Sequence, residues 1–186
     1  EIINPILKIF TRKKIILSYQ GSDINELGRS KNPIRIVCRS MADIILYNQK
    51  LHKNKIITIR NIPKYFIANG IDTDFFSQKI DKKIGGLTII SSNLDKQKTL
   101  DEIKKIEKRE EIKVKIIDTD FGIIPFEKMP ELLNQFEYYF DIKITDYGLF
   151  GRELSNTGLQ ALACGCKVIH DYGKGYEILE KMPEEH

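Results

Sequence analysis

An α/β fold with parallel strands is predicted for this chain of 186 residues. Short apolar runs alternate with amphipathic runs along its length, which is the pattern of strands separated by helices. Strand–helix–strand alternation implies parallel pairing with right-handed crossovers. Hydrophobic residues make up 41% of the chain and charged residues 30%, which fits a globular domain and argues against disorder. In such a sheet, ligands are expected at the carboxyl ends of the strands.

In the first part of the chain, short apolar runs surround one helical pattern. They predict strands at 14–19 and 43–47, a helix at 33–43, and further short apolar pieces at 56–59 and 65–68. A polar stretch at 78–86 then ends in two glycines and is the best candidate for a linker. We therefore expect a first domain over residues 1–79 and a second over residues 80–186.

The second part repeats the alternation with longer elements. Its apolar patterns predict strands at 87–91, 114–118, 138–144 and 167–170, and helices at 99–111, 126–136 and 155–164. The helix at 99–111 would open with a capping box formed by Thr99 and Glu102. The last helix would begin at Ser155 and stop at Gly165, since serine is a good N-cap and glycine ends helices.

Composition excludes several classes of protein. Cys38, Cys164 and Cys166 do not make a disulfide framework. Reduced core thiols are the favoured interpretation, with a metal site or a redox pair as the alternative. The net charge of +4 fits an anionic small ligand or an acidic membrane surface and is too small to indicate nucleic acid. No apolar stretch reaches the roughly 18 residues of a spanning helix, so a cytoplasmic location is expected.

A polar loop at 145–154 leaves one predicted strand and enters the helix that begins at Ser155. Asn156 and Thr157 then place amides and a hydroxyl in the first turn, and Gly158 removes a side chain where a ligand could lie close. A helix start of this kind favours phosphate, because its N–H groups and the helix dipole attract negative charge. The alternative is an ordinary capped core helix, and the spacing alone does not separate the two.

The helix and strand that follow carry a recognisable motif. LQALACGCKVI, at 159–169, resembles the LEAMACGxPVI segment of the group 1 glycosyltransferases, which are retaining, family-4-like enzymes of the GT-B fold. Three more segments resemble this family in the same order, namely YQGSD at 19–23 (its HGxD loop), ADIIL at 42–46 (its ADxII strand) and ANGIDTDFF at 68–76 (its PNGVDxxxF stretch). The resemblance covers nearly the whole chain and implies two Rossmann-like domains, the first of them incomplete.

The resemblance places the donor-binding residues one by one. SNLDKQKT, at 92–99, is similar to the family's SRLxxxKG segment, whose Arg and Lys meet the donor diphosphate. Lys98 falls on the family's Lys, Asn93 stands where Arg is usual, and Lys96 is an extra cation that could replace that Arg. A lysine offers a point charge and not the bidentate fork of arginine. The alternative for both lysines is a solvated helix entry.

The family's pair of glutamates is altered in this chain. Its second Glu, which holds the nucleotide ribose, falls on Gln160. Its first Glu, near the transferred sugar, falls on Arg152 by strict counting. Glu153, one residue on, is the better candidate for the catalytic carboxylate, because a loop absorbs such a slip. Residues 155–157 fall where the family's backbone amides cap a phosphate.

Two further carboxylates could suggest catalysis. Gly21 and Asp23 lie in the segment that resembles the family's acceptor-side loop, and Asp72 follows Asn69 and Gly70. We expect Asp72 to stabilise the turn beside Gly70, since Asp side chains commonly bond backbone amides nearby. For the same reason, we expect Asp23 to cap the turn that follows Asp23 itself.

Together these residues predict part of a glycosyltransferase that moves a sugar, with retention, from a nucleoside-diphosphate sugar to a glycan or lipid-linked acceptor. The resemblance implies no metal and no cofactor, because cations and amides neutralise the leaving diphosphate. Lysines in the first part would permit peripheral contact with the inner membrane face. Family members are longer, so we expect the chain alone to bind weakly and to transfer little or no sugar. The alternatives are a non-catalytic nucleotide-sugar-binding or scaffold protein of the same fold, and a sugar-nucleotide epimerase.

Overall fold

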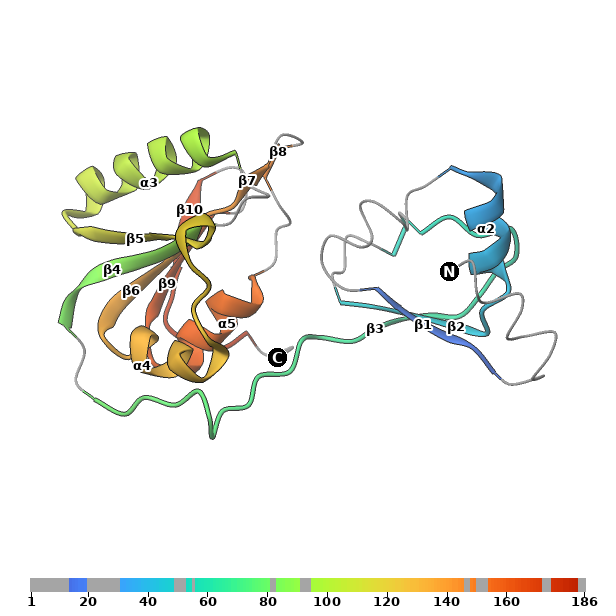
Figure 1. Ribbon diagram of the computed structural model, residues 1–186, viewed down its shortest axis with the longest axis horizontal. Helices are drawn as coiled ribbons and strands as arrows, with labels where there is room; N and C mark the ends of the chain where they lie inside the picture. The colour runs from blue at the N-terminus through green and yellow to red at the C-terminus, as the bar shows by residue number, and fades with distance from the viewer. Residues whose placement is uncertain are drawn as a thin grey trace. The chain divides into compact units, whose positions relative to one another are not determined.

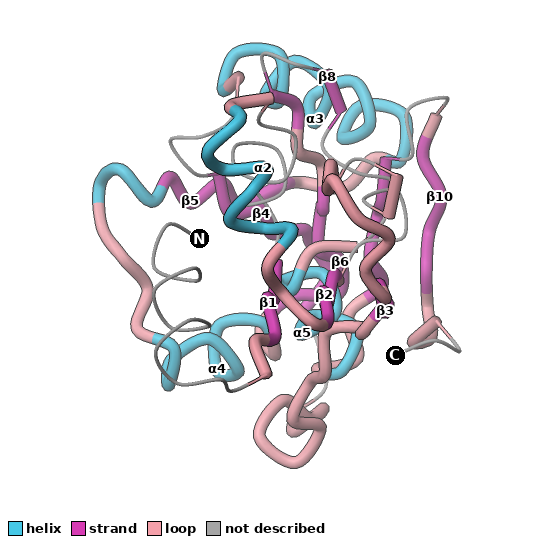
Figure 2. The backbone as a smooth tube through the Cα atoms, turned by 90° about the vertical axis from the view of Figure 1, so that its right-hand side faces the viewer, coloured by secondary structure: helices cyan, strands magenta, loops and turns pink. Residues whose placement is uncertain are grey.

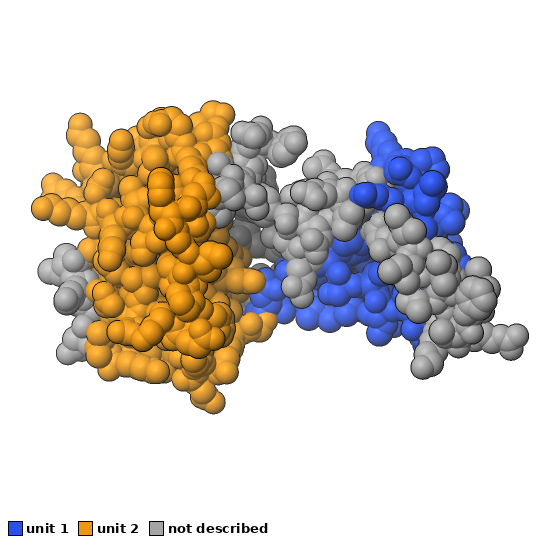
Figure 3. Space-filling model, in the orientation of Figure 1, with its two compact units in different colours: residues 1–69 blue, residues 70–186 orange. Residues whose placement is uncertain are grey.

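The computed structural model describes most of the chain. Its described residues are 14–19, 31–48, 53–54, 56–80, 83–90, 95–145, 148–149, 154–171 and 175–183. They belong to two compact units, Glu1–Asn69 and Gly70–His186 (Figure 3). Unit 1 has a sheet of parallel strands and unit 2 a mixed sheet that is mainly parallel, so the predicted α/β class is confirmed.

Unit 1 contains a sheet of three parallel strands in the order β1-β2-β3. These are β1 (Ile16–Tyr19), β2 (Ile44–Tyr47) and β3 (Lys64–Phe66). Helix α2 (Pro33–Ser40) connects β1 to β2 and begins where the Asn32 side chain accepts the N–H groups of the first turn. Pro33 at the first helical position suits that start, because its missing N–H would have no partner within the helix. The buried side chains of Tyr19, Ile45 and Ile62 lie in the core of the unit.

Unit 2 contains a five-stranded sheet in the order β10-β9-β6-β4-β5. Its strands are β4 (Lys83–Ile90), β5 (Val114–Asp118), β6 (Phe136–Asp141), β9 (Lys167–Asp171) and β10 (Tyr176–Leu179). All neighbours are parallel except β10, which runs antiparallel to β9. A separate two-stranded ribbon joins β7 (Ile144–Thr145) to β8 (Gly148–Leu149). The chain moves from β4 outward to β5 and then back past β4 to β6, so the winding direction reverses between β4 and β6.

Helices cover both faces of this sheet (Figure 1). Helix α3 (Lys96–Glu110) lies on one face, and α4 (Met129–Leu133) and α5 (Asn156–Ala163) lie on the other; the side view in Figure 2 shows the same layers. Two single turns, η3 (Thr119–Phe121) and η4 (Phe126–Lys128), lie in the connection from β5 to α4. Helices α3 and α5 therefore lie on opposite faces of the sheet.

The strands of unit 2 alternate between two apolar clusters, as a pleated sheet requires. Tyr139 and Val168 belong to the cluster that contains α5 residues such as Leu159, whereas Phe140 and Ile169 belong to the cluster that contains the α3 residues Ile103 and Ile106. Both clusters are built from side chains at most a tenth exposed. The burial of both sheet faces explains why these strands read as nearly continuous apolar runs in the sequence.

The expected linker at 78–86 is wrong, because its last residues belong to strand β4. The two units divide after Asn69, and the residues that follow pack in unit 2. Phe76 is buried in its core, and the N–H of Lys79 donates to Asn134 Oδ1 at 2.9 Å. The glycines that suggested a linker serve the strand instead: Gly85 has a φ of 140°, beside an irregularity in the pairing of β4 with β6.

Two helix boundaries also differ from the sequence prediction. Helix α3 begins at Lys96 with Asp95 as its N-cap, so Thr99 does not open it. Thr99 is instead buried, and its hydroxyl accepts the N–H of Ile144 at 3.4 Å. The helix expected at 126–136 is shorter, since it starts as a 3₁₀ turn and its regular part ends at Leu133, before β6 begins.

Gly86→Ala tests the packing of β4 against its neighbours. A Cβ atom at Gly86 would lie 2.6 Å from Phe140 Cε2 and 3.3 Å from Val114 Cγ2. Phe140 is fully buried, so its ring has little room to move, and we expect a loss of about 1–3 kcal/mol in the free energy of unfolding. Urea titration measures it. Gly70→Ala is the control, because nothing lies within 4 Å of the added atom; equal losses in the two variants would contradict this packing.

Candidate functional site

The start of helix α5 is fixed by a carboxylate from the sheet. Asp141 is the last residue of β6 and is buried. Its Oδ2 accepts the backbone N–H of Ser155 at 2.8 Å, and its Oδ1 accepts the Ser155 hydroxyl at 2.7 Å. Ser155 in turn accepts the N–H of Gly158 at 3.1 Å, which makes it the N-cap, as predicted. At the other end, Gly165 (φ 76°) stops the helix, also as predicted.

The Asp141 carboxylate bears on the phosphate site that the sequence predicts at residues 155–157. Both donors of Ser155 are bonded to Asp141. A negative side chain at a helix start is favourable, so Asp141 already fills part of the role that a phosphate would have. The other amides of the first turn belong to Asn156 and Thr157. Ordinary capping is thus present at Ser155, and phosphate binding at this turn stays a prediction.

Gly158 has a packing role. A Cβ at this position would lie 2.7 Å from Asp141 Oδ2 and 3.3 Å from Leu154 Cδ2. The glycine therefore lets the helix approach the carboxylate closely. The sequence predicted that the missing side chain leaves room for a ligand, whereas in the structure Asp141 lies in that space.

Two further polar side chains surround Asp141. Lys143 Nζ lies 3.4 Å from its Oδ1, and His170 Nδ1 lies 3.8 Å from its Oδ2. His170 is the register partner of Asp141 on the neighbouring strand β9, and neither of its buried ring nitrogens has a hydrogen bond. Sequence reasoning missed all three residues. The available signal was the position of Lys143 and His170 near the carboxyl ends of predicted strands, whereas Asp141 falls in the middle of the strand predicted at 138–144.

Tyr139 lies two residues before Asp141 on the same strand. Its buried hydroxyl is beside Thr157 without a hydrogen bond of normal geometry. Burial raises the pKa of Tyr139 well above its ordinary value, and the negative charge of Asp141 adds to that rise. The phenol therefore stays protonated at neutral pH and can act only as a neutral donor or acceptor.

The segment after β6 also reaches the start of α3. The carbonyl of Ile144 accepts the N–H of Asp95 at 2.8 Å, and the N–H of Ile144 donates to Thr99 Oγ1 at 3.4 Å. Residues 141–144 thus connect the starts of two helices that lie on opposite faces of the sheet. This is the point between β4 and β6 where the winding reverses, and ligands of open α/β sheets bind at such points.

Lys98 lies at the start of α3, in the first turn. Its Nζ is 2.7 Å from Asp95 Oδ2, and its side chain is 68% exposed. The hydrogen bond from this ammonium lowers the pKa of Asp95, with a second contribution from the Lys98 backbone N–H. Asp95 is only 19% exposed, but the lysine end of the pair lies in solvent, so an anionic ligand could take over the lysine at little cost.

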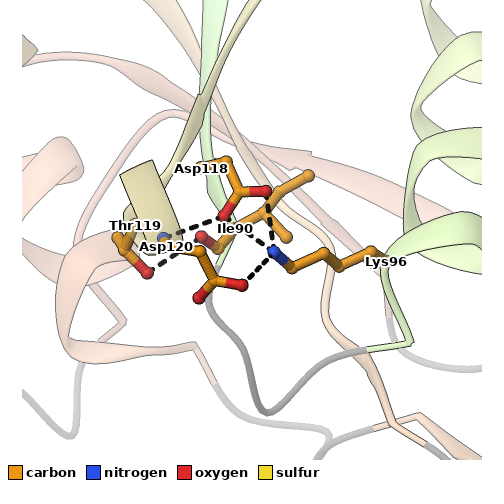
Figure 4. A network of polar contacts seen from close by, with 5 residues as sticks. All are labelled: Ile90, Lys96, Asp118, Thr119 and Asp120. Atoms are coloured by element: carbon orange, nitrogen blue, oxygen red, sulfur yellow. Dashed lines mark hydrogen bonds and ion pairs between the residues drawn. The ribbon is translucent and has the colours of Figure 1, made fainter. Parts of the chain in front are cut away.

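Lys96 is held more firmly than Lys98. Its Nζ lies 2.9 and 2.7 Å from the two carboxylate oxygens of Asp118 and also contacts Asp120 (Figure 4). The hydrogen bond to Asp118 raises the pKa of Lys96 most, followed by the bond to Asp120. The bond between Lys96 and Asp118 in turn lowers the pKa of Asp118. The lysine therefore fastens the turn after β5 to the start of α3. Sequence reasoning placed Lys96 near the donor and missed its two acidic partners.

The remaining predicted residues divide into two groups. Gln160 lies on α5, partly buried, one turn beyond the N-cap. Asn93, Glu153, Gly21 and Asp23 lie outside the described residues, so their roles stay predictions.

Two structural predictions from the sequence are confirmed. The Asp72 carboxylate accepts the N–H groups of Asp74 and Phe75 at 3.1 and 3.0 Å, so it pins a turn. All three cysteines are buried thiols, as expected for the core.

Comparison with known proteins gives no family for this chain: no protein-family model matches it, and no curated protein shows significant similarity to its sequence. Within the described ranges, no helix is both long and apolar enough to cross a membrane. The same part of the chain brings no three His, Cys, Asp or Glu side chains together in the way a metal ion requires. The proposed function therefore rests on the geometry at the carboxyl ends of strands β4 and β6.

Asp141→Asn tests the anchoring of α5. Asparagine keeps the size of the side chain but has one acceptor oxygen for the two donors of Ser155, so a buried donor loses its partner. We expect the free energy of unfolding to fall by about 1–3 kcal/mol. Asp101→Asn, at an exposed site on α3, is the matched control and should change little. Similar unfolding curves for Asp141→Asn and the original chain would show that this contact does not hold the helix.

Lys96→Met tests the turn after β5 by pH. Because the pKa of Asp118 is lowered in the folded chain, the pair stabilises it above the ordinary carboxyl value of 3.8, and this contribution disappears as the pH falls through the lowered pKa. The variant should therefore melt at a lower temperature than the original chain at about pH 7, and the difference should shrink towards about pH 2.

Lys128→Met removes a pair in which both side chains are 69% exposed, and it serves as the control for Lys96→Met. It should show a smaller difference in melting temperature. A constant difference across pH for Lys96→Met would mean that the ion pair is not its cause.

Proposed function

We propose that unit 2 is the donor-binding domain of a GT-B-type retaining glycosyltransferase and binds a nucleoside-diphosphate sugar. One observation carries the proposal. Helices α3 and α5 begin at the carboxyl ends of the adjacent strands β4 and β6, on opposite faces, and residues 141–144 connect their starts. Two helix starts at a reversal point give amides and positive dipole ends for one anionic ligand.

The diphosphate would lie at the starts of these helices. Lys98 would exchange its exposed pair with Asp95 for a phosphate oxygen. The first-turn amides of Asn156 and Thr157 would face the other phosphate, and the dipole of α5 would stabilise charge that develops on the leaving group. Asp141 would not bind the ligand. It would hold the turn in place, and Lys143 beside it would offset part of its negative charge.

The rest of the donor would follow the family pattern that the sequence resembles. Gln160 would meet the ribose hydroxyls without the charge assistance that a Glu would give. Glu153 would orient the transferred sugar. The acceptor would be a glycan or a lipid-linked chain.

A second candidate is a nucleotide-sugar-binding or scaffold protein of the same fold that does not catalyse transfer. The cluster around Lys96 favours it. This lysine is already shared by Asp118 and Asp120, so it is a poor replacement for the family's Arg at the diphosphate. The proposed site therefore depends on Lys98 for its main mobile cation.

Calorimetric titration with UDP- and GDP-sugars tests the proposal. We expect weak but saturable binding of at least one, and Lys98→Ala should weaken it about tenfold or more, because a charged hydrogen bond is lost. Lys128→Ala is the matched control, since it removes another exposed lysine of unit 2. Binding without turnover would favour the second candidate. Failure of every sugar nucleotide and of free UDP and GDP to bind would exclude both candidates.

A further inference from the structure

The connection between β5 and α4 exposes two large apolar side chains. Phe121 is 92% exposed and Ile123 is 88% exposed, the highest values among the large hydrophobic residues that the structure describes. Later in the same connection, Phe126 is treated differently: its ring stacks on Phe75 with centroids 5.3 Å apart. Phe121 therefore stands in water, whereas Phe126 on the same connection contacts the rings of Phe75 and Phe76. Single exposed apolar side chains are common on protein surfaces, so what Phe121 can do depends on where its turn lies and how it is held.

The backbone that carries Phe121 is firmly anchored (Figure 4). Lys96 holds the carboxylates of Asp118 and Asp120. The Thr119 hydroxyl donates to the carbonyl of Ile90 at 3.1 Å, and the N–H of Asp120 donates to Asp118 Oδ1 at 3.0 Å. The turn is therefore tied to both the end of β4 and the start of α3. An apolar ring on an anchored turn is available to a ligand without the entropic cost of ordering a loop.

The turn that carries Phe121 lies where the base of a bound nucleotide could reach it. Phe121 follows the carboxyl end of β5, and β5 is the neighbour of β4, which borders the reversal point. Adjacent strands lie about 4.8 Å apart, so the ends of β5 and β6 are about 10 Å apart across β4. If a diphosphate binds at the starts of α3 and α5, the attached ribose would span the distance from there towards the end of β5. The base would then arrive at the turn that carries Phe121.

We propose that Phe121 is the stacking platform for the nucleobase of the donor. This rests on the proposed function, because it places the base relative to a diphosphate at the reversal point. Stacking on an aromatic ring does not depend on the identity of the base, since every base has a π-face. Phe121 thus adds affinity for any nucleoside diphosphate, and choice among bases comes from other contacts. Ile123, which has no π-face, takes no part in stacking.

The absence of tryptophan from the sequence allows a direct test. Phe121→Trp introduces a single indole at the proposed platform, and Ile123→Trp introduces one two residues away as the matched control. Titration with UDP and GDP should quench the emission of Phe121→Trp saturably and leave that of Ile123→Trp nearly unchanged. Pyrophosphate, which has no base, should bind without this quenching.

Phe121→Ser complements the fluorescence experiment in calorimetry. It should weaken UDP and GDP by about 10- to 100-fold and leave pyrophosphate unchanged, whereas Ile123→Ser should leave all three nearly unchanged. If the original chain binds UDP and Phe121→Ser binds it equally well, the platform is wrong and the proposed function stands. Equal quenching at both positions also overturns the platform. If the original chain binds neither nucleotides nor pyrophosphate, both proposals fail together.

Discussion

The buried carboxylate of Asp141 is the contact on which the candidate site depends. It ends β6 and holds Ser155 by the backbone N–H and the hydroxyl, so it sets where α5 begins. The backbone then continues to Ile144, which bonds to Asp95 and Thr99 at the start of α3. Because the two helices lie on opposite faces, a single short segment positions both helix starts. The packed clusters on each face of the sheet keep that segment in place.

At the carboxyl end of the sheet, the positive and negative side chains of the described residues are closely balanced. This balance limits which ligands the site can bind. Lys143 faces Asp141, Lys98 faces Asp95, and Lys96 faces two carboxylates. An anionic ligand must therefore compete with the protein's own carboxylates for each of these cations. The competition is least costly at Lys98, whose side chain is the most exposed of the three. The same balance explains why we expect weak binding, with aromatic stacking as a compensating source of affinity.

Local signals in the sequence predicted the local parts of this structure. The N-cap at Ser155 and the stop at Gly165 follow from residue type, and the apolar runs located the main strands. The partners of Asp141 and Lys96 could not be found in this way, because they lie 14 and 22 to 24 residues away and meet only when the sheet forms. The start of α3 was ambiguous for a related reason: both Asp95 and Thr99 are good caps, and burial of Thr99 against Ile144 decides between them.

We propose that the reversal point between β4 and β6 binds a nucleoside diphosphate. Backbone amide chemical-shift mapping during a titration with UDP tests it most directly, because it reports on every part of the chain at once. Saturable shifts are expected, largest at Lys98, Asn156, Thr157 and Phe121, with smaller changes in unit 1. Shifts confined to unit 1, or no saturable shifts at high UDP concentration, would contradict it.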